Sequence, residues 1–206
     1  MQNIVNMISH LEKYPERIVE IQGIAHSHRI LHSYLNETQW ITDTILNAYL
    51  STFQSHNRVE NTLICSSFEF CVIERNLNLV HLAEKLCSFH RLLMPICIGN
   101  HWLVADFYPF CSRLDVYDSL YLKNDYLEQM FTNFWATVQN LKGWKTDLII
   151  SFNDAPKQSD RNSCGIYCIS FIRSLHLGIP FPDIDNGLTS IRENILYTIL
   201  ESKFNS

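Results

Sequence analysis

The sequence predicts a single α+β domain with a central, mostly antiparallel sheet flanked by helices. Amphipathic helical patterns lie towards both ends of the chain, and short apolar runs with the length of strands are gathered between them. Strands grouped in this way favour α+β over alternating βαβ units. The 206 residues, of which 47% are hydrophobic, suit one core, so we expect residues 1–206 to form one domain.

The N-terminal region, residues 1–36, combines a helical pattern with an irregular stretch. A helix is predicted over residues 2–13 because four apolar side chains recur there at helical spacing: Ile4, Met7, Ile8 and Leu11. Residues 14–36 show no such period and are expected to be irregular. Three histidines in this stretch have no acidic or cysteine partner at metal-ligand spacing, so we expect no metal site there: His26, His28 and His32.

The core expected over residues 37–206 opens with a helix predicted over residues 38–54, with Thr38 as its candidate cap. Apolar side chains recur at helical spacing from Trp40 to Leu50. A short strand over residues 61–65 and a helix over residues 78–87 are predicted next.

Three strands are expected to form the centre of the sheet. Residues 91–98 are a continuous apolar run typical of a buried strand, and Gly99-Asn100 predicts a turn. Two further strands follow over residues 101–107 and 113–117. The remaining predicted elements are a helix over 123–141, a strand over 147–152, a helix over 164–177 ended by Gly178, and a helix over 188–202.

Charge and cysteine content argue against several classes of function. The net charge is −5 and the basic residues are scattered, which gives no footprint for nucleic acid or an anionic membrane. No apolar run is long enough to span a membrane, and residues 1–20 lack the apolar core of a signal peptide. The seven cysteines include no Cys-x-x-Cys pair, so we expect a reducing compartment rather than a disulfide framework or a zinc site.

The strongest sign of chemistry lies between Gln158 and Gly165. A polar loop ends there in Cys164-Gly165 and an apolar helix follows at once, which places the cysteine at a helix N-terminus. The unpaired N–H groups and partial positive charge of that end favour a thiolate. Gln158 could direct its side-chain amide into the same space. We interpret Cys164 as a nucleophile and Gln158 as an oxyanion-stabilising donor.

A cysteine nucleophile needs a histidine base and an acid that orients it. His101 begins one predicted strand and Asp118 ends the next. If the hairpin turns near Pro109, facing residues have numbers that sum to about 219, which places His101 opposite Asp118 with Cβ atoms about 4.5–5.5 Å apart. We therefore predict that His101 is the base and that Asp118 is its partner.

Each of these residues also has a plain structural interpretation. Cys164 could be a small buried hydrophobe, His101 a structural strand residue and Asp118 the opener of a turn. The catalytic interpretation is favoured because Cys164, Gln158, His101 and Asp118 all stand at mutually consistent places.

Other candidates compete poorly for these roles. His176 lies about 18 Å along the helix from Cys164, and Cys168, one turn on, is expected to face the core. The remaining histidines considered lie on or beside predicted helices without a paired acid: His10, His56, His81 and His90.

Four motifs resemble those of a known family, the cysteine proteases that cleave SUMO and other ubiquitin-like modifiers (the sentrin-protease group of the adenain-like clan). They lie in the family's order within residues 40–168 and are Trp40-Ile41-Thr42-Asp43, His101-Trp102, Tyr117-Asp118-Ser119 and Gln158 through Cys164-Gly165. The chain departs from the family pattern at Ser163, where many members have Asp, and at Ile41-Thr42, which replaces Leu-Asn.

The resemblance implies a papain-like fold for the catalytic core over residues 37–206, with the chain order His, Asp, Cys. Cys164 would be the nucleophile, His101 the general base and later the acid, and Asp118 the orienting carboxylate. Gln158 would form the oxyanion hole together with the Cys164 N–H group.

The resemblance also implies how substrate is held. Trp40 and Trp102 would wall a narrow tunnel that admits only a Gly-Gly tail. Asp43 would lie near the basic part of the modifier's C-terminal strand. Within the N-terminal 1–36 region, residues 14–36 are candidates for contacts with the body of the modifier, as are residues 55–77.

The implied function is a thiol protease or isopeptidase that cleaves after the C-terminal Gly-Gly of ubiquitin, SUMO or a NEDD8-type modifier, with no cofactor and no metal. We expect a monomer in the cytoplasm or nucleus, or in a host cytosol if the protein is a secreted bacterial effector. Two alternatives stay open: an acetyltransferase of the same clan that uses acetyl-CoA, and a non-catalytic modifier-binding module.

Overall fold

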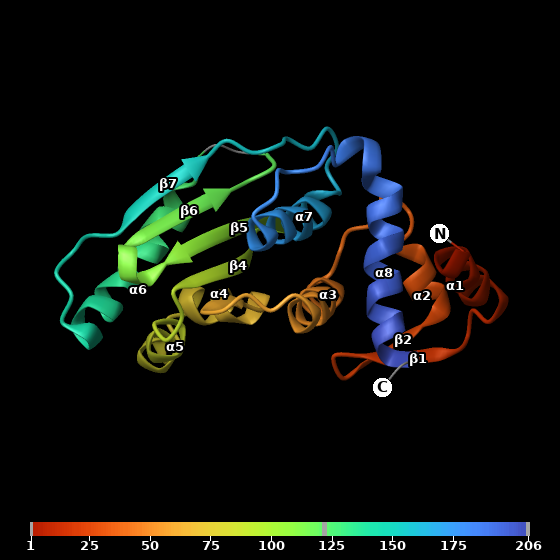
Figure 1. Cartoon of the computed structure of the whole chain (residues 1–206), viewed down its shortest axis with the longest axis horizontal. Coiled ribbons are helices and arrows are strands. Elements are labelled where there is room, and N and C mark those ends of the chain that lie inside the picture. The colour runs from red at the N-terminus through yellow and green to blue at the C-terminus, as the bar shows by residue number, and fades with distance from the viewer. Residues whose placement is uncertain (1, 121–122, 205–206) are drawn as a thin grey trace.

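A five-stranded sheet forms the centre of the computed structural model, which describes residues 2–120 and 123–204 (Figure 1). The two central pairings, β4/β5 and β5/β6, are antiparallel, and the two outer pairings, β3/β4 and β6/β7, are parallel. The sheet is therefore mixed, and the α+β class predicted from the sequence is confirmed. Its strands, in spatial order, are β3 (Thr62–Ile64), β4 (Arg91–Ile98), β5 (His101–Tyr108), β6 (Arg113–Tyr117) and β7 (Ile149–Asn153).

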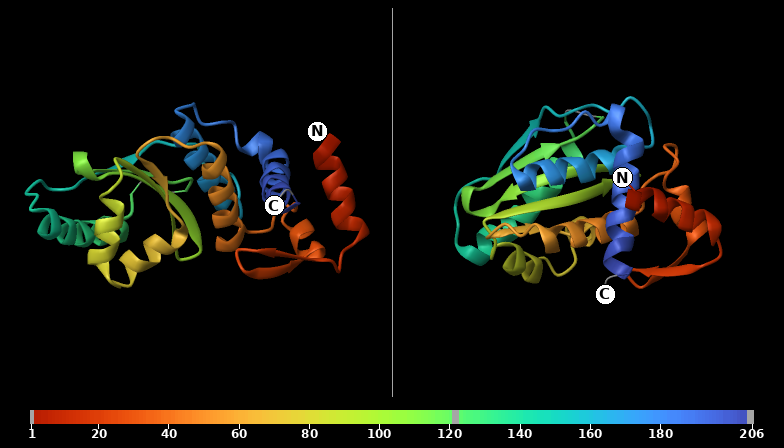
Figure 2. Two further views of the ribbon diagram at one scale, coloured as in Figure 1. Left: turned by 60° about the horizontal axis from the view of Figure 1, so that its bottom comes forward. Right: turned by 45° about the vertical axis from the view of Figure 1, so that its right-hand side comes forward.

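Helices cover both faces of this sheet (Figure 2). On β5, Trp102 and Val104 belong to one hydrophobic cluster, whereas Leu103 and Ala105 belong to the other. Because both faces are buried, β4 and β5 are buried at nearly every position and consist mostly of apolar residues. The first cluster includes α3 (Asp43–His56), α7 (Cys164–Leu177) and α8 (Leu188–Phe204), and the second includes α4 (Ser67–Glu74), α5 (Leu79–Leu86) and α6 (Asp125–Lys142).

The N-terminal region is more regular than the sequence predicts. The helix expected over residues 2–13 is present as α1, but residues 14–36 contain a hairpin and a short helix instead of irregular chain. Gln22 and Gly23 both have positive φ and form the two-residue turn of that hairpin. Strands of four residues are too short to show a period. These elements are α1 (Gln2–Lys13), β1 (Ile18–Ile21), β2 (Ile24–Ser27) and α2 (His28–Ser33).

The segment that leads into α3 is not helical, and here one prediction is wrong. The helix begins at Asp43 and not near Thr38, and Thr42 occupies its N-cap position. Thr38 instead makes a local turn, in which its backbone N–H and its hydroxyl both donate to Asn36 Oδ1 at 2.9 Å. Trp40 therefore precedes the helix.

Helix α8 holds the first part of this segment. Arg192 is 1% exposed, and its guanidinium donates to the carbonyls of Tyr34 (3.0 Å) and Glu37 (3.1 Å). A buried cation thereby fixes the chain that approaches Trp40 from the N-terminal side.

Predicted boundaries elsewhere in the core mostly hold. The helix predicted over residues 164–177 is found with those bounds, and Gly178 ends it with φ +65°. Helix α4 was not predicted, because its eight residues are apolar on most sides and show little helical period. Within residues 2–120 and 123–204, no helix is long and apolar enough to cross a membrane.

Candidate active site

His101 and Asp118 meet at one end of the β5–β6 hairpin, although they do not face each other directly. The strands pair Val104 with Tyr117, so facing residues sum to 221 and the predicted register is wrong by two residues. The turn is longer than assumed, since it includes a 3₁₀ segment (Pro109–Cys111) and Ser112 in the left-handed region. A shift of two residues keeps both side chains on the same face of the sheet.

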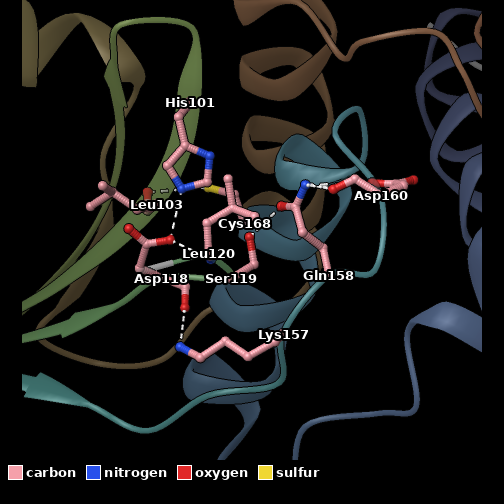
Figure 3. A network of polar contacts seen from close by, with 9 residues as sticks. All are labelled: His101, Leu103, Asp118, Ser119, Leu120, Lys157, Gln158, Asp160 and Cys168. Atoms are coloured by element: carbon pink, nitrogen blue, oxygen red, sulfur yellow. Dashed lines mark hydrogen bonds and ion pairs between the residues drawn. The ribbon is translucent and has the colours of Figure 1, made fainter. Parts of the chain in front are cut away.

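The pair is close and shielded from solvent. His101 Nε2 lies 2.7 Å from Asp118 Oδ1, and the exposed fractions of the two side chains are 15% and 5% (Figure 3). His101 follows a tight turn in which Gly99 and Asn100 both have positive φ, as expected for a two-residue hairpin loop. Asp118 Oδ1 also accepts the Leu120 N–H at 2.7 Å, which fixes the carboxylate on its own loop.

The electrostatics favour a charged imidazole. Burial lowers the pKa of His101, but hydrogen bonds to Asp118 and to Cys164 outweigh it, and together they raise the pKa to about 9. The ring is therefore protonated at neutral pH. An imidazolium beside the cysteine stabilises a thiolate, which is the reactive form of the nucleophile.

Cys164 is the first residue of α7 and is 3% exposed. The following glycine is needed for packing: a Cβ atom on Gly165 would lie 2.8 Å from Ile41 Cβ and 3.3 Å from Trp102 Cδ1. Only glycine lets the start of α7 come this close to the segment before α3. The Cys-Gly pair thus combines a thiol at a helix N-terminus with close backbone packing.

Gln158 is buried beside the acid loop. Its Oε1 accepts the Ser119 hydroxyl at 2.6 Å, and its backbone N–H donates to the Ser119 carbonyl at 3.0 Å. Its Nε2 donates to the Asp160 carbonyl at 2.9 Å. The side-chain amide of Gln158 therefore links Ser119, which follows the acid Asp118, to Asp160 in the loop before Cys164.

The two tryptophans differ in exposure. Trp102 is 6% exposed and its indole donates to the Ile41 carbonyl at 3.1 Å. Trp40 is 41% exposed and its indole donates to Asn162 Oδ1 at 2.7 Å, so it is tied to the nucleophile loop. That they wall a tunnel for a Gly-Gly tail stays a prediction.

Asp43 is exposed at the first position of α3, where its Oδ1 accepts the Thr44 N–H at 2.8 Å. This location leaves the carboxylate on the surface, three residues after Trp40. Its role in binding a modifier stays a prediction.

Sequence reasoning missed three polar residues that support the site. Ser119 orients Gln158, Asn162 holds Trp40, and Asp160 accepts from the loop before Cys164. Asp160-Arg161-Asn162 was a usable signal, because Asp and Asn favour turns in which the side chain accepts nearby N–H groups. Cys168 faces the core as predicted, with Sγ 3.5 Å from the Leu103 carbonyl.

We searched the part of the chain that the structure describes for side chains that could bind a metal ion together. Within it, no three His, Cys, Asp or Glu side chains are grouped so that they could hold a metal ion.

Known proteins resemble this chain in sequence and in fold. Residues 39–203 match the model of the Ulp1 protease family, C-terminal catalytic domain. A sentrin-specific protease of Caenorhabditis elegans is 25% identical over 157 residues, which are 66% of this chain and 22% of that protein. The chain therefore spans about a fifth of the length of this relative.

Two solved structures share the fold. The C-terminal Ulp1 protease domain in complex with Smt3, the yeast ortholog of SUMO, has a TM-score of 0.75 at 16% identity, covering 98% of this chain and 95% of that one. The Xanthomonas campestris effector XopD bound to ubiquitin has a TM-score of 0.58 at 17% identity, covering 76% of this chain and 91% of that one. With the family match over residues 39–203, these findings place the chain in the Ulp1 protease family of cysteine proteases.

Proposed function

We propose that the protein is a thiol isopeptidase that releases a SUMO-type modifier by cleaving after its C-terminal Gly-Gly. The observation that carries the proposal is the close His101–Asp118 pair, taken together with Cys164 at the start of α7, whose thiol helps to raise the pKa of His101. Such a constellation activates a thiol for acyl transfer.

The reaction begins with attack of the Cys164 thiolate on the carbonyl carbon of the terminal glycine. The negative charge passes to the carbonyl oxygen, where the Cys164 N–H and Gln158 Nε2 are the candidate donors. The tetrahedral intermediate collapses as His101 gives its proton to the leaving lysine amine, which leaves an acyl-thioester on Cys164. Neutral His101 then takes a proton from water, and the hydroxyl oxygen attacks the thioester carbon. The C–S bond breaks, so the modifier leaves with a free carboxylate, and the Cys164 thiolate and the His101 imidazolium are restored.

Selection of a diglycine tail is supported by the packing at this site. Gly165 packs against Ile41 and Trp102 with no space for a Cβ atom, so these two side chains lie next to the residue that follows the nucleophile. Trp40, tied to Asn162, stands at the exposed side of the same loop. We propose that the tail passes between the tryptophan side chains, where residues without side chains would fit most easily and bulkier residues would be excluded.

A SUMO-type modifier is the first choice among the three. The neighbour complexed with Smt3 resembles this chain over 98% of its length, whereas the neighbour bound to ubiquitin covers 76%. Ubiquitin is the second candidate, on the basis of that neighbour. Residues 14–36 and 55–77 are the surfaces that we propose contact the body of the modifier. We further propose that the protein acts as a monomer in the cytoplasm or nucleus, or in a host cytosol if it is a secreted effector.

The test is a turnover panel with fluorogenic C-terminal amides of SUMO, ubiquitin and a NEDD8-type modifier. We expect the SUMO amide to be hydrolysed with the highest kcat/KM and the Cys164→Ala variant to hydrolyse none. Faster hydrolysis of ubiquitin would reject the choice of modifier. No hydrolysis of any of the three by the unaltered protein would reject the proposed function.

A further inference from the structure

We propose that Asp160 is a positioning residue that holds both donors of the oxyanion hole, a role that rests on the proposed function. Asp160 lies between Gln158 and Cys164 in the chain. It does not belong to any of the four groups that carry the chemistry. Its contacts nevertheless reach both sides of the nucleophile loop.

The carboxylate of Asp160 accepts three hydrogen bonds from the two residues just before Cys164. Oδ1 accepts the backbone N–H groups of Asn162 (3.1 Å) and Ser163 (3.0 Å), and Oδ2 accepts the Ser163 hydroxyl at 2.6 Å. A single side chain thereby fixes the turn that leads into α7.

Ser163 is held from both directions. Its N–H and hydroxyl donate to Asp160, while its carbonyl accepts the N–H groups of Ile166 (2.8 Å) and Tyr167 (3.0 Å). The peptide bond between Ser163 and Cys164 contains that carbonyl and the Cys164 N–H, and it is planar. Because the carbonyl points along α7, the Cys164 N–H points out of the helix start, towards the place of a developing oxyanion.

The second donor depends on Asp160 as well. Ser119 donates to Gln158 Oε1, which turns the amide nitrogen towards Asp160, as Figure 3 shows. Nε2 carries two hydrogens. The Asp160 carbonyl accepts one at 2.9 Å, and Asp160 Oδ1 accepts the other in a longer hydrogen bond of 3.4 Å. We assign the hydrogen of this longer bond to the oxyanion during the reaction.

The contacts of Asp160 concern the two donors of the oxyanion hole and not the formation of the thiolate. The thiolate depends on His101 and on the helix end, whereas stabilisation of the oxyanion depends on where two N–H groups point. Loss of Asp160 should therefore weaken binding of a transition-state mimic and leave the reactivity of the thiol largely intact.

The experiment compares Asp160→Ala and Asp160→Asn with the unaltered protein, and it uses three readouts. These are hydrolysis of the fluorogenic SUMO amide, inhibition by a peptide aldehyde ending in Gly-Gly-al, and alkylation of Cys164 by iodoacetamide. The aldehyde forms a hemithioacetal whose oxygen occupies the oxyanion hole. Asp154→Ala is the matched control, since Asp154 is an exposed carboxylate on the same connection between β7 and α7.

For Asp160→Ala we expect kcat to fall by about tenfold to a hundredfold, less than for outright removal of one donor. KM should stay within about twofold, aldehyde affinity should fall by the same factor as kcat, and the alkylation rate should stay within about twofold. Asp160→Asn keeps an acceptor oxygen and should recover most of the loss, because the turn needs an acceptor more than a charge. Asp154→Ala should behave like the unaltered protein.

Two results would overturn the proposal for Asp160 alone, with the unaltered protein active. One is a fall in kcat with no loss of aldehyde affinity in either Asp160 variant. The other is a parallel loss of kcat, alkylation rate and melting temperature in both variants, which would make Asp160 purely structural. If the unaltered protein hydrolysed no modifier amide, the proposed function would fail, and this role would fail with it.

Discussion

The Nε2 atom of His101 lies 2.7 Å from Oδ1 of Asp118, although the β5–β6 register ends at the pair Val104–Tyr117 and, continued by one residue, would place Leu103 and not His101 opposite Asp118. The two side chains meet diagonally, at the end of the sheet where β5 begins and β6 has just ended. Because they share a face, this diagonal contact is possible, and it directs the imidazole towards the start of α7.

Replacing Asp118 should uncouple this pair. Asp118→Asn removes the charge that helps to raise the pKa of His101, so the imidazolium should be lost at lower pH. We expect kcat/KM to fall by about 10²–10⁴-fold, the usual contribution of a positioned acid–base group. The measurement is the rate of Cys164 alkylation by iodoacetamide as a function of pH. The pH range over which this rate is constant should differ between the variant and the unaltered protein. An unchanged profile would contradict the assigned role of Asp118.

The same pair makes stability depend on pH. The pKa of His101 is about 9 in the folded protein and 6.5 in its reference state, so the charged imidazole stabilises the fold. This contribution is full below about pH 6.5 and is lost as pH rises to about 9; it is on the order of 3 kcal/mol. Urea unfolding of the unaltered protein and of His101→Gln should show the extra loss between pH 6.5 and 9 only in the former. An equal loss of unfolding free energy in both proteins between pH 6.5 and 9 would contradict this prediction.

Gly165 should tolerate no side chain. In Gly165→Ala the new Cβ would meet Ile41 Cβ at 2.8 Å, and both atoms belong to packed main-chain segments that cannot easily move. We expect a loss of about 1–3 kcal/mol in the free energy of unfolding together with lower activity. Gly187→Ala is the control, because its nearest contact is 3.5 Å. A similar effect at both positions would show that the close approach at Gly165 does not matter.

The hydrogen bond from Trp40 to Asn162 should contribute to substrate binding. Asn162→Ala removes the acceptor of the exposed indole, and we expect KM for the SUMO amide to rise by about three- to tenfold, as for one lost hydrogen bond. Asn162→Asp keeps an acceptor and should change KM little. A double-mutant cycle with Trp40→Phe, which lacks the indole N–H, tests the coupling. Fully additive effects would show that this bond plays no part.

The sequence was sufficient for the elements that carry the chemistry. Helix α7 was predicted with its true bounds because its apolar run is long and ends at a glycine with positive φ. The diagonal meeting of His101 and Asp118 was predicted only in outline, since the turn length that sets the register was not readable. A register error of two residues left the pairing intact, whereas an error of one would have placed the side chains on opposite faces.

The parts that were missed depend on contacts between distant segments or on short elements. The β1–β2 hairpin and α4 are too short to give a reliable period. Thr38 was mistaken for a cap because a threonine before an apolar pattern is typical of one, and its local bonds to Asn36 compete with that role. Ser119 and Asn162 act across 39 and 122 residues of sequence, a pairing that no local pattern reveals.

The most direct test of the account is the site of covalent capture by a SUMO probe with a C-terminal vinyl sulfone. Intact mass and peptide mapping should show one adduct, on Cys164, in the unaltered protein and in Cys168→Ala. The adduct should be absent in Cys164→Ala and formed more slowly in Asp118→Asn. Capture on another cysteine, or undiminished capture by Cys164→Ala, would contradict the assignment of Cys164 as the nucleophile of a modifier-specific protease.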